Sequence, residues 1–231
     1  MPGYRLLTKI KELLLFFIPN KNMQHAVGLH TWPTKNYEIW VILQDLLYLI
    51  KPQELVEFGA GRSTNYLAEY AYKFQAKLVS IEQHFFYFVK LRIGFKCLFL
   101  PVRVIKYAPL RGCWYDVKRV KKYLEPLRNI DFLFYDGPTG TSKGDRNSED
   151  FYIHVIPLLK NIKMIVVDDV HRDKENKIAQ HLTRELKLKR YNVTYIHNAQ
   201  VAFLFSPAAE EKAAELPIYL KKLLVPAESS G

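Results

Sequence analysis

The sequence predicts an α/β protein in which helices cover both faces of a mostly parallel, doubly wound sheet of seven strands, giving a three-layer sandwich. Three observations lead to this fold class. Short apolar runs alternate with segments of helical periodicity five times along the chain, which is the pattern of βα units. Two of these runs deliver a carboxylate directly into a glycine-rich turn, at 57–61 and at 136–140. The last two runs, 191–196 and 201–205, are separated by a short link that indicates a C-terminal antiparallel hairpin.

The predicted elements follow one another in regular order. The first helix is expected over 37–50, where apolar residues recur at helical spacing until Pro52 stops the pattern. Strands are predicted at 55–58, 76–82, 102–107, 130–136 and 164–167, ahead of the hairpin. Helices are predicted from the glycine turn to Tyr72 and at 83–92, 149–159 and 173–188, with a short one in the tail after Pro207.

The size and composition suit one domain with small appendages. At 231 residues and 49% hydrophobic content, the chain can bury the core of a single α/β domain. Residues 1–35 are expected to form an N-terminal helix and a lid-like loop, 36–207 the α/β domain, and 208–231 a C-terminal helix and tail.

The charge and the cysteines restrict the partners and the compartment. A formal net charge of +11 allows an anionic partner such as nucleic acid, a membrane face or a phosphorylated substrate. The basic residues are spread along the chain, so a solvated surface explains them equally well. Cys97 and Cys113 lack metal-site spacing and are too few for a disulfide framework, which favours a reducing compartment and a cytoplasmic location.

Residues 4–18 combine basic and apolar side chains in one amphipathic segment. No apolar run in the sequence approaches the length of a membrane span. The segment could form a helix that packs on the body of the protein. It could also rest on a membrane surface as a peripheral helix, and the sequence leaves both interpretations open.

The stretch 57–64 is predicted to bind a ligand. Glycines at 59 and 61 let the backbone turn tightly and let a ligand approach without a Cβ in the way, and Ser63 or Thr64 could cap the helix that follows. A phosphate-binding P-loop would need a Lys after the second glycine, and a dinucleotide fingerprint would need a third glycine where Thr64 stands. Glu57 suits instead a ligand with a cationic end.

Glu82 ends the second predicted strand, about twenty residues beyond the glycines, where an acid can accept hydrogen bonds from both hydroxyls of a ribose. This placement fits S-adenosylmethionine and NAD equally well. Glu82 could also merely cap the helix that starts near Phe85.

Carboxylates also end the fourth and fifth strands. Asp136 leads into a long, polar, glycine-rich loop of the kind that often carries function. Asp168 and Asp169 are adjacent, and two carboxylates at one strand end repel each other unless a metal ion or an arginine lies nearby.

Over 37–207 the chain resembles the class I S-adenosylmethionine-dependent methyltransferases, which have a Rossmann-like fold. The resemblance rests on the order and spacing of Glu57 to Gly61, Glu82, Asp136 and the terminal hairpin. It implies S-adenosylmethionine as the cofactor, with Glu57 near its methionine end and Glu82 at its ribose. The residues expected to bind the cofactor are Glu57, Gly59, Ala60, Gly61, Ser63, Thr64, Glu82 and Asp136.

The chain is also similar to the catechol-type O-methyltransferases of that class. That resemblance implies a divalent cation such as Mg²⁺ on Asp136, Asp168 and Asp169, although Asp169 stands where that group usually has Asn. A cation there would lower the pKa of an acceptor hydroxyl. Without a metal, Asp136, Asp169 or His171 could act as the base. Lys143, Arg146 and Arg172 are the expected substrate contacts, and the two arginines could equally neutralise the carboxylates.

The predicted activity is methyl transfer to a hydroxyl of a small molecule or glycan. Asp-Gly-Pro at 136–138 replaces the Asn/Asp-Pro-Pro-aromatic motif that usually goes with a base nitrogen as acceptor, so nucleic acid is a minority interpretation. An NAD-dependent oxidoreductase could use the same turn and Glu82. A non-catalytic binding domain of the same fold is the remaining alternative.

Overall fold

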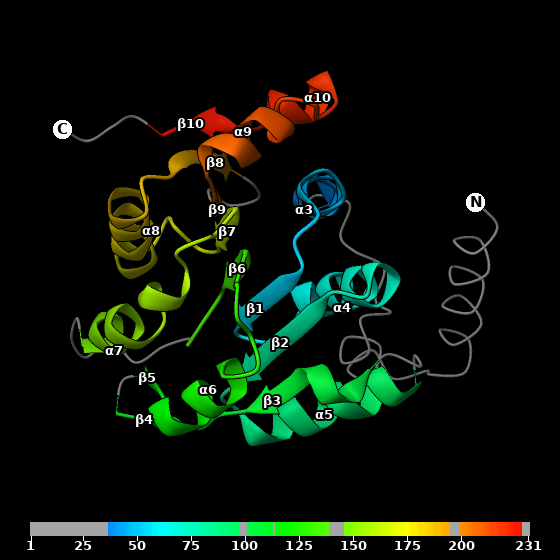
Figure 1. Ribbon diagram of the computed structural model, residues 1–231, viewed down its shortest axis with the longest axis vertical. Coiled ribbons are helices and arrows are strands. Elements are labelled where there is room, and N and C mark those ends of the chain that lie inside the picture. Colours follow the sequence, from blue (N-terminus) through cyan, green and yellow to red (C-terminus); the bar gives the residue numbers. More distant parts are fainter. Residues whose placement is uncertain (1–36, 98–100, 113, 139–145, 195–198, 228–231) are drawn as a thin grey trace.

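A mixed sheet of eight strands forms the centre of the computed structural model, which describes residues 37–97, 101–112, 114–138, 146–194 and 199–227 (Figure 1). The strand order is β10-β8-β9-β7-β6-β1-β2-β3. The strands are β1 (Glu54–Phe58), β2 (Lys77–Glu82), β3 (Ile105–Tyr107), β6 (Phe132–Tyr135), β7 (Met164–Val167), β8 (Lys189–Thr194), β9 (Gln200–Phe205) and β10 (Val225–Pro226). Strands β1, β2, β3, β6 and β7 are parallel, while β8, β9 and β10 pair antiparallel. The predicted fold class is confirmed.

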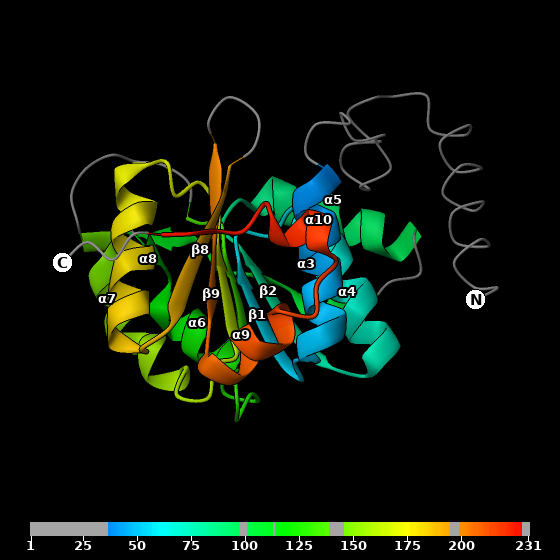
Figure 2. The same ribbon diagram turned by 90° about the horizontal axis from the view of Figure 1, so that it is seen from above.

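Helices form a layer on each face of the sheet (Figure 2). One layer contains α3 (Tyr37–Ile50), α4 (Arg62–Phe74) and α5 (Phe85–Cys97), with α9 (Pro207–Ala213) and α10 (Ile218–Lys221) packed at its edge. The other contains α6 (Val117–Leu124), α7 (Arg146–His154) and α8 (Asp173–Glu185). Side chains of β1 alternate between two apolar cores, with Leu55 in the first and Val56 and Phe58 in the second.

The structure departs from the predicted elements in a few places. Strand β10 is an eighth strand, and β4 (Leu110–Arg111) with β5 (Trp114–Tyr115) forms a small separate hairpin where a loop was expected. Residues Val102–Val104 form a 3-10 turn, η1, so the third strand is shorter than predicted. The helix predicted at 149–159 divides into α7 and the 3-10 turn η2 (Ile156–Leu158), because Pro157 has no N–H to continue an α-helix.

Several predictions fall outside the described residues: the N-terminal helix and lid-like loop at 1–35, the amphipathic segment 4–18, and Lys143. Within the described ranges, no helix has both the length and the apolar character needed to cross a membrane.

Two buried carboxylates hold together the amino ends of the central strands. Asp131 accepts hydrogen bonds from the backbone N–H groups of Gln53 (2.9 Å) and Glu54 (3.0 Å) and forms a salt bridge of 2.8 Å with Lys163. The Glu54 side chain in turn accepts from the N–H groups of Arg128 and Asn129, each at 2.6 Å. These contacts join the starts of β1, β6 and β7, and the opposite, carboxyl ends of the strands carry the candidate site.

Candidate active site

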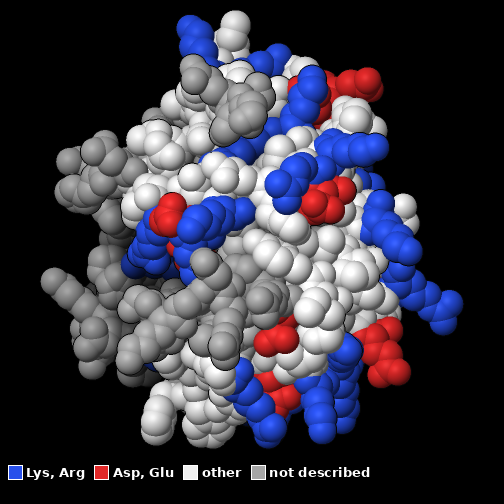
Figure 3. Space-filling model, turned by 90° about the vertical axis from the view of Figure 1, so that its left-hand side faces the viewer, with Lys and Arg blue, Asp and Glu red and all other residues white. Residues whose placement is uncertain are grey.

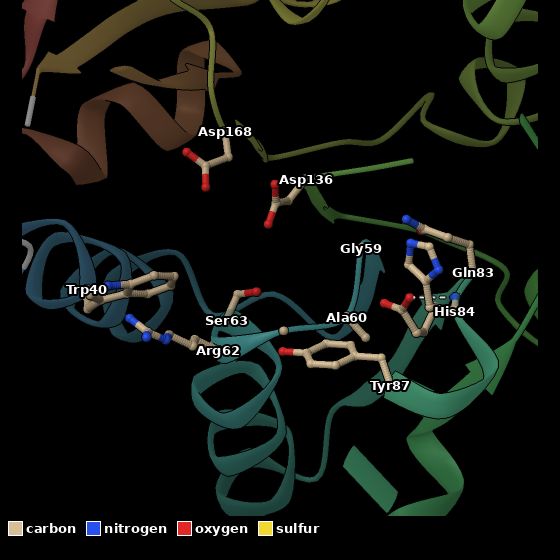
Figure 4. A pocket seen from close by; sticks show the side chains of 12 residues that line it. Trp40, Gly59, Ala60, Arg62, Ser63, Gln83, His84, Tyr87, Asp136 and Asp168 are labelled. Atoms are coloured by element: carbon tan, nitrogen blue, oxygen red, sulfur yellow. Dashed lines mark hydrogen bonds between the residues drawn. The ribbon is translucent and has the colours of Figure 1, made fainter. Parts of the chain in front are cut away.

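A cavity of about 340 Å³ lies at the carboxyl ends of β1, β2, β6 and β7 (Figure 4). This is the edge where open α/β sheets bind ligands, beside the point at which the strand order reverses between β1 and β6. The cavity is lined by Trp40, Gly59, Ala60, Gly61, Arg62, Ser63, Glu82, Gln83, His84, Tyr87, Asp136 and Asp168. Its volume falls within the range of small-molecule sites.

The floor of the cavity is the turn between β1 and α4. Gly59 has a φ of +87°, and a Cβ on it would lie 2.4 Å from the main-chain oxygen of Asp136, so a larger residue does not fit there. Gly61 is extended, and the nearest atom to a Cβ on it would be 3.9 Å away. The Gly61 N–H donates to the Thr64 hydroxyl at 2.7 Å. The first glycine is therefore required by the fold, while the second leaves open space at the cavity.

Glu57 is completely buried behind this turn and does not line the cavity. Its carboxylate accepts hydrogen bonds from Ser63 (2.5 Å), Thr64 (2.7 Å) and Ser80. Burial raises the pKa of Glu57 to about 7, against the three hydroxyl donors, which lower it. Of the eight predicted cofactor residues, Glu57 and Thr64 thus form a supporting layer, while the other six line the cavity.

Glu82 occupies the cavity wall at the end of β2. It is almost fully buried and accepts a hydrogen bond of 2.7 Å from the backbone N–H of His84, drawn as a dashed line in Figure 4. Burial is the largest effect on its carboxyl group and raises the pKa of Glu82 to about 7.

Asp136 and Asp168 line the cavity at the ends of β6 and β7, with the backbone of Asp136 next to Gly59 (Figure 4). The Asp136 N–H donates to the carbonyl oxygen of Phe58 at 2.8 Å, and the Asp168 N–H donates to that of Tyr135 at 2.9 Å, so each residue extends the parallel sheet by one step. Burial, followed by the nearby charges of Asp168 and Asp169, raises the pKa of Asp136 well above its usual value.

The Asp169 carboxylate pairs with a residue outside the cavity lining, although its charge still helps to raise the pKa of Asp136. The Asp169 backbone is left-handed, with a φ of +55°, and its carboxylate forms a salt bridge of 2.8 Å with Arg172 and lies 3.8 Å from His171. None of these three residues lines the cavity. Arg172 therefore has the neutralising role that the sequence left open, and the side chain of Arg146 lies outside the described part of the structure.

The three carboxylates predicted as metal ligands do not converge. Asp136 and Asp168 face the cavity and Asp169 turns to Arg172. Among the described residues, no group of three or more His, Cys, Asp or Glu side chains has an arrangement that could hold a metal ion. We therefore derive no catalytic step through a metal.

No protein-family model and no curated protein sequence matches this chain, whereas solved structures match its fold. An O-methyltransferase from Bacillus cereus in complex with S-adenosylhomocysteine has a TM-score of 0.53 at 15% identity, over 85% of this chain and 90% of that one. A Podospora anserina methyltransferase bound to S-adenosylhomocysteine has a TM-score of 0.51 at 14% identity, over 86% and 96%. The human methyltransferase 10 domain containing protein has a TM-score of 0.51 at 12% identity, over 76% and 85%.

The chain has the class I methyltransferase fold. At these identities the similarity defines the architecture, and the chemistry has to be argued from the site. In this methyltransferase fold, the carboxyl ends of β1, β2, β6 and β7 bring the glycine turn, Glu82, Asp136 and Asp168 around one cavity.

Five residues of the cavity were not among the predicted site residues: Trp40, Arg62, Gln83, His84 and Tyr87. Gln83 and His84 directly follow Glu82, and Arg62 lies inside the glycine turn, so adjacency to a predicted residue was the available signal. Trp40 matched the apolar face of a helix, and it does stack on Tyr66 with ring centroids 5.3 Å apart. No feature of the sequence around Trp40 indicates that this residue lines a site.

Proposed function

We propose that the protein is an S-adenosylmethionine-dependent methyltransferase that acts on a hydroxyl of a small molecule or glycan. The observation that carries the proposal is the cavity itself, in which the Gly59 to Gly61 turn faces the carboxylates of Glu82, Asp136 and Asp168. The fold supports the same activity, since its solved neighbours include an O-methyltransferase in complex with S-adenosylhomocysteine.

The charge of the cavity favours a cationic cofactor over a dinucleotide. Glu82, Asp136 and Asp168 line it, and Glu57 lies directly behind it. In a partly buried site these carboxylates would attract a sulfonium and repel a pyrophosphate. Arg62 is the only lysine or arginine among the described lining residues. The residues present therefore fit S-adenosylmethionine, with Glu82 placed to accept hydrogen bonds from ribose hydroxyls.

S-adenosylmethionine would supply an activated methyl group on sulfur, which leaves the protein two tasks: to orient the acceptor and to take up its proton. Asp136 is the carboxylate placed for the second task. Burial and the neighbouring carboxylates raise its pKa above that of an ordinary aspartate, so the ionised carboxylate is a stronger base. Asp136 would accept the proton of the acceptor hydroxyl as the methyl group is transferred.

The remaining expectations stay predictions. These are a divalent cation, contacts from Lys143 and Arg146 to the acceptor, a cytoplasmic location, and membrane contact through residues 4–18. Asp169 and His171 lie outside the cavity lining. Asp169 would influence the reaction through its charge, which raises the pKa of Asp136.

Calorimetric titration with S-adenosylhomocysteine and with NAD, each with and without magnesium, tests the proposal. We expect S-adenosylhomocysteine to bind and NAD not to bind. Glu82→Gln should weaken binding, whereas Glu125→Gln, a carboxylate outside the cavity, should leave it unchanged. Binding of NAD alone would overturn the proposal, and binding of neither ligand would favour a non-catalytic domain. Binding that requires magnesium would support the prediction of a divalent cation.

A further inference from the structure

Helix α5 presents an apolar stripe to solvent. Phe85, Phe86, Val89 and Ile93 are all exposed, and Phe86 has 87% of its surface accessible. Phe85, Val89 and Ile93 are four residues apart and so lie on one face of the helix. Single exposed apolar residues need no explanation, but a contiguous row on one helix marks an interaction surface.

A cationic cavity of about 430 Å³ adjoins this stripe at the edge of the sheet. It is lined by Arg92 of α5, Arg103 and Lys106 beside and within β3, and Arg119 of α6, and no acidic residue lines it. In the described part of the chain, none of these four forms a salt bridge with a carboxylate. Burial, Arg92 and Arg103 together lower the pKa of Lys106, as expected where cations gather without an anion.

Aromatic rings join the stripe to the cavity. Phe85 and Phe88 of α5 each pack on Tyr107 with ring centroids 5.5 Å apart. Arg92 lies over Phe88 at 5.2 Å, and Arg119 lies over Tyr107 at 5.7 Å. Apolar and cationic groups thus form one continuous surface, which we call the α5–β3 corner: Phe85, Phe86, Val89, Ile93, Arg92, Arg103, Lys106 and Arg119.

The surface around α7 and α8 is different. On that side of the molecule, Lys and Arg are interspersed with Asp and Glu (Figure 3). Pairs such as Lys177 with Asp173, at 3.1 Å, neutralise each other there. A larger cavity of about 1090 Å³ next to the corner shares Arg103 and Lys106 and also lacks an acidic lining residue, so the excess of positive charge continues along this edge of the sheet.

We propose that the α5–β3 corner docks on a membrane surface that contains anionic phospholipids. The cations that line the cavity would contact the headgroup phosphates, and the apolar stripe would enter the upper acyl region. Phe85 and Phe86 could contact either lipid or a nucleic-acid base, but Val89 and Ile93 have no ring on which a base could stack, so the stripe as a whole fits lipid better than single-stranded nucleic acid. Aliphatic side chains do transfer favourably into hydrocarbon.

Co-sedimentation of the 231-residue chain with vesicles tests this docking. We expect binding to vesicles of phosphatidylcholine with phosphatidylglycerol, and little binding to phosphatidylcholine alone. The double variant Arg103→Gln/Lys106→Gln should weaken binding about 30-fold, and Phe86→Ser about 10-fold. The control variants Lys160→Gln/Lys212→Gln and Ile218→Ser change exposed residues elsewhere and should bind as the native protein does.

Three results would overturn the proposal. The first is the absence of binding to anionic vesicles, and the second is binding that both variants leave unchanged, which would place the contact elsewhere. The third is a different occupant: a single-stranded RNA that binds through the same residues, or a dimer in sedimentation velocity that Phe86→Ser dissociates. Arg103 and Phe86 are exposed, and Lys106 is partly buried without a salt bridge among the described residues, so thermal unfolding of each variant should match the native protein.

Discussion

Gly59 and Asp136 touch through their backbones: a Cβ on residue 59 would lie 2.4 Å from the main-chain oxygen of Asp136. The contact joins the turn after β1 to the turn after β6, on either side of the point where the strand order reverses. Gly137 completes it, since a Cβ there would lie 3.1 Å from the Cα of Gly59. This backbone contact therefore determines how far the glycine turn lies from the Asp136 carboxylate, which is proposed as the base.

Gly59→Ala should destabilise the protein by about 2–4 kcal/mol, because it adds a clash with the backbone of Asp136 to an unfavourable positive φ. Gly61→Ala is the matched control, since its Cβ would meet nothing closer than 3.9 Å. We expect Gly61→Ala to fold normally and to weaken binding of S-adenosylhomocysteine. Urea denaturation and calorimetry measure the two effects separately. Equal loss of stability in both variants would contradict this division of roles.

Glu57 should make the ligand-free protein less stable as the pH rises. Its pKa is about 7 in the folded protein and 4.5 in the unfolded chain, so its contribution is fully present below pH 4.5 and is lost as the pH rises through 7. The change is about 3 kcal/mol. Glu57→Gln should reduce the slope between pH 4.5 and 7 and leave the part due to Glu82, whose pKa is also about 7, as measured by the free energy of unfolding at several pH values. A slope that is the same in both proteins would show that Glu57 is ionised throughout.

Asp131→Asn should make the protein less stable without changing the cavity at the carboxyl ends of the strands. The substitution leaves Lys163 without its partner and weakens the acceptors for the N–H groups of Gln53 and Glu54, at a cost of about 2–4 kcal/mol. Lys163→Gln should cost less, because that lysine is partly exposed. Ligand affinity, measured where both variants are still folded, should match the native protein. A loss of affinity would mean that the amino ends of the strands influence the cavity.

Asp136→Asn should lower kcat/KM by about 100-fold or more once an acceptor is known, because the acceptor hydroxyl loses its base. A second variant, Asp168→Asn, tests whether the pH dependence comes from Asp136. The charge of Asp168 raises the pKa of Asp136, so its removal should move the acidic limb of the pH–rate profile to lower pH. Binding of S-adenosylhomocysteine should survive in both variants. An acidic limb that persists in Asp136→Asn would assign the proton transfer to another group.

The sequence by itself was enough to predict the fold class and most of the cavity. Apolar runs and helical periodicity reveal the order of strands and helices, and in a doubly wound sheet the carboxyl ends of the parallel strands meet at one edge. Gly59, Glu82, Asp136 and Asp168 each follow or end such a strand, so their convergence could be predicted without knowing any side-chain position.

Tertiary structure decided which of these residues face the ligand. Asp168 and Asp169 are adjacent in sequence, yet the left-handed backbone at Asp169 sends its carboxylate to Arg172 and leaves Asp168 at the cavity. Glu57 is separated from the cavity by the start of α4, which supplies two of its three hydroxyl partners. Trp40 enters the site from α3, far from any motif. Periodicity fixes which face of an element is buried, but the direction of a side chain at a strand end depends on the loops and helices that pack around it.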